Sequence, residues 1–222
     1  NTLIGGLAGD AITDADYNVA VGKSSLGTNT VGSHSVAVGR NALFYQNPST
    51  ATDMYNTAVG SQAGNQVTTG IENTLIGGLA GDAQTTANYN TLIGSIAGSA
   101  LTTGGENVAV GRAALFAGTE GTQNVAIGNA SLSTNTTGQF NVAVGYKALQ
   151  LNVDGDGAVA VGYEALKSQE PSDGLTYNLA AGYQSGTSVT TGTHNTFVGG
   201  LAGDATDDGK YNVAIGVSAL SA

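Results

Sequence analysis

The sequence predicts an all-β protein, a parallel β-solenoid in which each turn of the chain contributes one repeat. A motif of the type Asn107-Val108-Ala109-Val110-Gly111 occurs thirteen times, and ten of the twelve intervals between successive motifs are 17 residues long. The second and fourth motif positions are mostly β-branched and the fifth is always Gly, which favours a short strand and a bend over a helix. A fixed short period indicates that residues 1–222 form a single array of thirteen stacked coils.

Each repeat, or coil, is divided here into columns numbered from its first motif residue, so that Asn107 is in column 1 and Gly111 in column 5. Column 1 is Asn in eleven of the thirteen copies, and such a column can form hydrogen bonds from coil to coil. Column 1 and the invariant Gly of column 5 are therefore predicted to be structural. The residues concerned include Gly5, Gly22, Gly39, Gly60, Gly77, Gly94, Gly111, Gly128, Gly145, Gly162, Gly182, Gly199, Gly216, Asn18, Asn107 and Asn141.

The rest of each repeat is expected to bring the chain back to the start of the next coil. Columns 7 to 9 are predicted to form a short second strand. Column 15 is Gly in eight of the ten 17-residue copies, as in Thr102-Thr103-Gly104, and this Gly is expected to supply a positive φ for a tight turn.

Columns 3 and 9 vary together. Column 9 is Leu in seven copies, and column 3 is Ala in all seven; column 9 is Gly in the other six, and in four of those column 3 is large. Only the copies that start at Asn56 and Asn178 combine Ala with Gly. A large residue at one place and a small one at the other is what two positions sharing one volume require, so columns 3 and 9 are predicted to meet in space.

The motif strand carries no charge on either side, which indicates that it is buried on both faces. One face can line the interior of the solenoid. The other, taken to be the stripe of Ala, Gly and Asn in columns 1, 3 and 5, would expose several hundred Å² of weakly polar surface. A partner chain is the simplest cover, so we expect a homo-oligomer.

Two motifs also carry a resemblance that covers essentially the whole chain. Residues 35–39 (Ser-Val-Ala-Val-Gly) and 124–128 (Asn-Val-Ala-Ile-Gly) resemble the head repeats of trimeric autotransporter adhesins. The longer pattern of residues 56–64, with Thr68-Thr69-Gly70 before the next Asn, is similar to Gly-rich repeats in tail fibres of marine bacteriophages. The resemblance implies a left-handed β-roll in a parallel homotrimer.

Composition restricts the partners. Six Lys and Arg face sixteen Asp and Glu, and the resulting charge of −10 repels phosphate backbones, so we expect no nucleic-acid partner. No apolar run is long enough to span a membrane, so no membrane insertion is expected for this segment. The array starts at the first residue of a repeat and ends within another, which indicates the middle of a longer polypeptide.

Two long intervals and an aromatic column are the candidates for surface binding. The intervals run over residues 45–55 and 167–177 and contain the only two prolines. Insertions in a solenoid are commonly displayed on its binding side, although a tolerated bulge is the alternative. Aromatic residues immediately before column 1 can stack on sugars or pack on the next coil. The candidate residues are Tyr45, Pro48, Tyr55, Tyr89, Pro171 and Tyr177.

No pattern indicates an enzyme, a cofactor or a metal centre. His34 and His194 share one column but lie nine coils apart, so neither can complete a nucleophilic triad with the other. Asp10, Asp82 and Asp204 each follow a Gly, but single carboxylates several coils apart do not form a calcium cage.

The sequence thus predicts an extracellular structural fibre, a trimeric shaft in a viral tail fibre that supports attachment to a host-surface glycan or protein receptor. The alternative is the head or passenger region of a bacterial trimeric surface adhesin or extracellular filament. An ice-binding solenoid, which would use the Thr of column 13, is disfavoured because Val153 and Asp207 interrupt that column.

Overall fold

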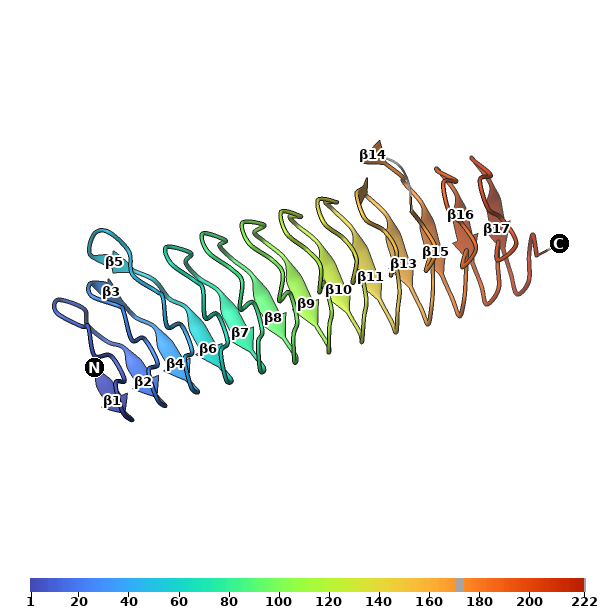
Figure 1. Cartoon of the computed structure of the whole chain (residues 1–222). Coiled ribbons are helices and arrows are strands. Elements are labelled where there is room, and N and C mark those ends of the chain that lie inside the picture. Colours follow the sequence, from blue (N-terminus) through green and yellow to red (C-terminus); the bar gives the residue numbers. More distant parts are fainter. Residues whose placement is uncertain (171–173, 222) are drawn as a thin grey trace.

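A computed structural model describes residues 1–170 and 174–221, and these residues form a β-solenoid (Figure 1). Its main sheet has thirteen parallel strands, each paired with the strands one repeat away. These strands are β1 (Thr2–Ile4), β2 (Val19–Val21), β4 (Val36–Val38), β6 (Thr57–Val59), β7 (Thr74–Ile76), β8 (Thr91–Ile93), β9 (Val108–Val110), β10 (Val125–Ile127), β11 (Val142–Val144), β13 (Val159–Val161), β15 (Leu179–Ala181), β16 (Thr196–Val198) and β17 (Val213–Ile215). The predicted fold class is confirmed.

The strands pair in register, so every column of the repeat becomes a line of residues along the rod. Ala109 in β9 pairs with Leu92 in β8 and with Ala126 in β10. With a separation of about 4.8 Å between neighbouring strands, the thirteen coils form a rod roughly 60 Å long. The two termini lie at opposite ends (Figure 1).

The two longer repeats add short strand pairs at one edge of the rod. β3 (Gly32–Ser33) pairs with β5 (Thr52–Asp53), and β12 (Gly155–Asp156) pairs with β14 (Gly174–Leu175). Figure 1 shows β5 and β14 rising from the same edge of the solenoid. The insertions therefore extend a return turn and leave the main sheet unbroken.

Column 5 requires Gly for two reasons. All thirteen of its glycines have φ between 125° and 145°, a conformation that side chains rarely adopt. A Cβ atom on Gly111 would also come closer than 3.0 Å to the backbone of Gly128 in the next coil. Gly in column 5 therefore meets both a conformational and a steric requirement of the solenoid.

The buried Asn column connects each coil to the next. Asn107 donates from Nδ2 to the carbonyl of Gly121, 2.9 Å away, and its Oδ1 accepts from the backbone N–H of Asn124 at 3.0 Å. Asn18 and Asn141 make the same pair of bonds in their own coils. These bonds satisfy backbone groups that would otherwise be buried without a partner, so the side chains of column 1 connect neighbouring coils.

The Asn column is interrupted at the two longer repeats, where column 1 is Ser35 and Ala158. A buried Gln in column 12 makes a different link there: Oε1 of Gln46 accepts from Nδ2 of Asn56 at 3.0 Å, and Oε1 of Gln169 accepts from Nδ2 of Asn178 at 2.8 Å. Both longer repeats thus combine an insertion, a missing Asn and a Gln in column 12, although Gln84 occupies the same column in a 17-residue repeat.

Columns 3 and 9 meet in the interior, as predicted. A Cβ atom on Gly98 would lie 2.7 Å from a methyl carbon of Leu92 in the same coil. A Cβ on Gly81 would lie 3.0 Å from methyl carbons of both Leu75 in its own coil and Leu92 in the next. A large residue in column 3 therefore requires Gly in column 9 of its own coil and of the preceding coil.

This rule explains the two repeats that combine Ala with Gly. A Cβ on Gly64 would lie 2.6 Å from a methyl carbon of Leu75 in the following coil, and a Cβ on Gly186 would lie 2.9 Å from the ring of Phe197. Both coils precede one with a large residue in column 3, so they act as adaptor coils between the two packing types.

The outward face of the main sheet is the opposite of the one predicted. Columns 1 and 3 line the interior, where Asn107 and Ala109 are fully buried. The outward side chains are those of columns 2 and 4, and Ile76, Ile127 and Val161 are 36 to 42% exposed. The exposed stripe is therefore mostly β-branched, with an apolar column 4 and a column 2 of mainly Val and Thr, and the small inward residues allow the two walls of each coil to pack closely.

Two expectations about the turns were wrong. Columns 7 to 9 contain no strand and form a turn in which columns 7 and 9 have positive φ, as in Ala113 (56°) and Leu115 (52°). The glycines of column 15 such as Gly104 are not among the residues with positive φ. At Gly104 a Cβ would overlap the carbonyl of Gly121 in the next coil, so the preference for Gly there is steric, although the column also contains Ala15 and Ala87.

Candidate functional site

The last residue of each repeat, called column 17 also in the two longer repeats, has a positive φ and lies at the surface. Tyr17, Tyr55, Tyr89, Tyr177 and Tyr211 are all between 51 and 73% exposed. The aromatic column predicted from the sequence is therefore real, and it lies along one edge of the rod.

Histidines complete this column in two places, which the sequence analysis did not anticipate. The ring centroid of His34 lies 4.8 Å from that of Tyr17 and 5.1 Å from that of Tyr55. His194 lies in the same way between Tyr177 and Tyr211, at 5.3 and 4.8 Å. The signal was the shared column number of histidines and tyrosines.

In each Tyr–His–Tyr triad the histidine ring lies between two tyrosine rings: Tyr17 stacks on His34, whereas Tyr177 meets His194 edge-on. The first triad is also linked to β5, because Nδ1 of His34 lies 3.0 Å from Oδ1 of Asp53 and the hydroxyl of Tyr55 donates to Oδ2 of Asp53 at 3.4 Å. This geometry leaves ring edges and hydroxyl groups, more than ring faces, for contact with a ligand.

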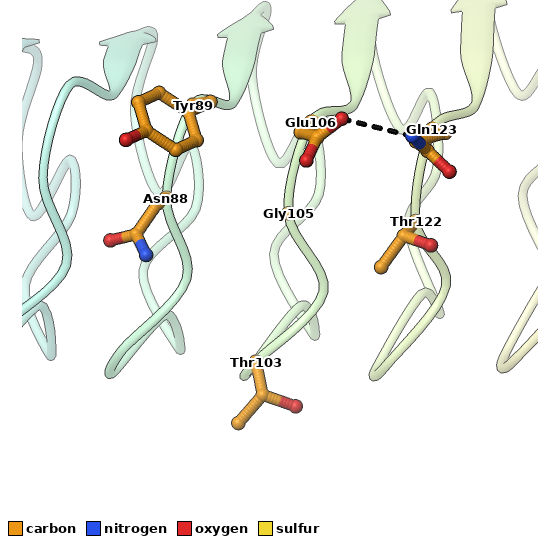
Figure 2. A pocket seen from close by; sticks show the side chains of 7 residues that line it. All are labelled: Asn88, Tyr89, Thr103, Gly105, Glu106, Thr122 and Gln123. Atoms are coloured by element: carbon orange, nitrogen blue, oxygen red, sulfur yellow. Dashed lines mark hydrogen bonds between the residues drawn. The ribbon is translucent and has the colours of Figure 1, made fainter.

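Tyr89 differs from the triads because its neighbours in column 17 are Glu72 and Glu106, and no aromatic ring among the described residues stacks on it. It borders an open pocket of about 300 Å³ (Figure 2). The pocket is lined by Asn88, Tyr89, Thr103, Gly105, Glu106, Thr122 and Gln123. Figure 2 shows one row of Tyr89, Glu106 and Gln123 beside a second row of Asn88, Gly105 and Thr122.

The pocket exists because column 16 is Gly105 in its central coil, where the neighbouring coils have Asn88 and Thr122. Its carboxylate is held in place: Nε2 of Gln123 donates to Oε2 of Glu106 at 3.0 Å. We therefore take this pocket, around the predicted residue Tyr89, as the candidate functional site.

The other predicted surface residues have different surroundings. Tyr45 is exposed and packs edge-on against Phe44, with ring centroids 4.7 Å apart. Pro48 is buried and lies over Gly32 of the preceding coil, so it is not available as a surface contact. Pro171 lies outside the described residues.

A second aromatic stack was not predicted. Tyr146, Tyr163 and Tyr183 in column 6 stack with ring centroids 5.2 Å apart, and Nζ of Lys147 lies 5.2 Å from the ring of Tyr146. Column 6 was interpreted only as a variable surface column, although three consecutive tyrosines in one column indicate a stack once the register is known.

The described residues offer no metal centre: no three His, Asp or Glu side chains come together in residues 1–170 and 174–221. The same part of the chain has no helix long and apolar enough to cross a membrane. The Thr of column 13 are engaged within the rod, since Oγ1 of Thr102 donates to the carbonyl of Thr119 at 2.9 Å.

Asp82 is half-buried, and its ionised carboxylate lowers the stability of the folded state. Its Oδ1 is buried without a hydrogen-bond partner, and burial raises the pKa of Asp82 above the ordinary value of 3.8. A raised pKa means that the folded state favours the protonated form, so this contribution to stability is present below pH 3.8 and is lost as the pH rises through the folded-state value.

We expect Asp82→Asn to raise the free energy of unfolding at pH 7, by less than about 1 kcal/mol because solvent screens part of the charge. Thermal melts at pH 7 and pH 3 measure the effect, and the gain should be absent at pH 3. Asp10→Asn in the same column is the control, since Asp10 is exposed. A gain that persists at pH 3 would contradict the electrostatic explanation.

Taken together, the coils and columns define a β-solenoid repeat protein with one continuous parallel sheet. Comparison with protein-family models, with curated proteins and with solved structures found no match. The resemblance to tail-fibre and adhesin repeats therefore stays a prediction that depends on the repeat motif.

Proposed function

We propose that this chain is a structural, non-enzymatic shaft segment of an extracellular fibre, which associates with two further copies of itself and supports attachment to a host surface. The observation that carries the proposal is the uncharged outward face of the thirteen-strand sheet, which continues over the whole rod. The repeat motif favours a viral tail fibre, and a bacterial surface adhesin is the alternative.

The composition of this face supports self-association. Column 4 consists of Val, Ile and one Ala, and column 2 of Val, Thr and one Leu, so neither contains a charge. A stripe about 10 Å wide along a rod of about 60 Å has an area of roughly 600 Å², which is close to the share that one partner buries in a specific interface. Exposed apolar stripes of this length are unusual in monomers.

A second copy also fits the stripe geometrically. Every coil presents the same two columns at the same spacing, so identical chains aligned in parallel bring like residues to one height at every coil. A parallel trimer would bury the stripes of all three chains around one axis.

The test combines the mass of the assembly with a single introduced cysteine, because the chain has none of its own. Sedimentation equilibrium should give three times the mass of the chain. In a parallel, in-register trimer Val38→Cys should form a disulfide between two copies, because the third coil of each chain meets the third coil of the others.

Antiparallel copies would place the third coil against the eleventh, so Val38→Cys would then stay reduced, while Val38→Cys mixed with Ala181→Cys would cross-link. A monomeric mass at micromolar concentration would overturn the proposed assembly. The flanking segments of the parent polypeptide distinguish the two origins: a collar-attachment or chaperone segment supports the fibre, and an outer-membrane anchor supports the adhesin.

A further inference from the structure

The groups that line the pocket beside Tyr89 suit a ligand that combines a cationic group with hydroxyl groups. The ring of Tyr89 is 51% exposed, and its faces are not occupied by neighbouring rings as those of the triads are. A free aromatic face of this kind attracts an ammonium group through its quadrupole and stacks on the apolar face of a sugar ring.

The charge around the pocket has one sign. Glu72 and Glu106 occupy column 17 in the coils on either side of Tyr89, each about 4.8 Å away along the rod axis. The chain contains no Lys or Arg between Arg40 and Arg112, so no basic side chain of this segment neutralises the two carboxylates. Such a site repels anions and favours a cationic ligand.

The remaining lining groups suit hydroxyl groups. Thr103 and Thr122 contribute hydroxyls, and Asn88 contributes an amide beside the bare backbone of Gly105. Because Gln123 fixes one oxygen of Glu106, the carboxylate does not need to be ordered when a ligand binds.

We propose that this pocket binds an amino sugar through its protonated amine, with the ammonium group between Glu106 and the ring of Tyr89 and the sugar hydroxyls on the threonine and amide side chains. This inference names a ligand class for the attachment role proposed above. It does not depend on self-association, because the pocket is formed by columns 14, 16 and 17 of one chain.

The experiment compares two ligands that differ only in the charge of one group: oligosaccharides of glucosamine and of N-acetylglucosamine, titrated into the assembled protein and followed by NMR or calorimetry. The titration is run at about pH 6, where the amine of glucosamine is protonated. We expect the glucosamine oligosaccharide to bind about tenfold more tightly than its acetylated counterpart, and the difference to shrink in high salt.

Variants assign the site. Glu106→Gln, which keeps the size of the side chain, should remove the preference for the free amine, and Tyr89→Ala should weaken binding of glucosamine oligosaccharides at least about fivefold. Tyr183→Ala, another exposed tyrosine, should leave binding unchanged, and circular dichroism checks that each variant is folded. Equal binding of both oligosaccharides, binding unaffected by Tyr89→Ala, or no binding of either ligand would overturn the inference.

The outcomes for the pocket and for the shaft are separable. Sedimentation of the same samples reports the oligomeric state. A trimer that binds neither oligosaccharide would therefore contradict only the ligand assignment. Binding by a protein that remains monomeric would defeat only the proposed assembly.

Discussion

Ala109→Leu alone should destabilise the protein by about 1–3 kcal/mol, and adding Leu115→Gly should recover much of that loss. The single variant places two large side chains in the volume that columns 3 and 9 share, in a coil where Leu115 is fully buried. The double variant converts this coil to the packing type of its neighbour, which has Leu92 and Gly98. Chemical denaturation of all four members of the cycle gives the coupling free energy between the two positions.

The structure provides a matched control one coil further along. Ala126→Leu with Leu132→Gly is the same pair of substitutions, but the preceding coil there has Leu115 in column 9, whereas the coil before Ala109 has Gly98. We expect much less recovery at this second site because the new leucine still meets Leu115. Equal recovery at both sites would show that a column-3 side chain does not reach the preceding coil.

Val110→Lys should abolish the trimer. Column 4 faces outward at the middle of the rod, and in the proposed assembly three lysines would meet at one height in an apolar contact that leaves their charges without partners. We expect the protein to sediment as single chains at concentrations at which the wild type is trimeric. The substitution is compatible with a folded solenoid, because the side chain points away from the interior.

The control for this charge is Thr86→Lys, on an exposed turn of the same rod. It adds the same charge without touching columns 2 and 4, so we expect the trimer to persist. Loss of the trimer with Thr86→Lys, or a trimer unaffected by Val110→Lys, would mean that the outward face of the sheet is not the contact surface.

Much of the fold could be predicted because the chain contains thirteen copies of one repeat, so each column can be compared across thirteen residues. A position that is always Gly, such as Gly111, has a conformational or steric cause whatever the fold, and the anticorrelation of columns 3 and 9 could be recognised as shared volume. The direction of the strand faces was wrong because Ala109 and Val110 are both apolar, so hydrophobicity alone does not say which of them points inward.

The turns were less predictable for a related reason. In columns 7, 9 and 17 residues such as Leu115 and Tyr89 adopt positive φ although they carry side chains, so composition gives no warning. At Gly104 in column 15 the next coil approaches closely, a contact between residues 17 positions apart that depends on the three-dimensional stack.

The candidate site was predicted in part. Tyr89 and the aromatic column follow from the repeat, but the pocket depends on Gly105 lacking a side chain between Asn88 and Thr122 of neighbouring coils. The enclosure of His34 between two tyrosines likewise requires residues of one column to be compared across coils. In both cases the residues could be read from the sequence, but their contacts follow only from the register in which the coils stack.

The adaptor coils limit how an array of this kind can lengthen during evolution. Repeats multiply by unequal recombination, which inserts whole units at random junctions. A repeat with Leu in column 3 can follow a repeat with Gly in column 9, such as the one containing Gly64. It cannot directly follow a repeat with Leu in column 9. The order in which the two packing types can follow one another is therefore restricted in one direction along the chain.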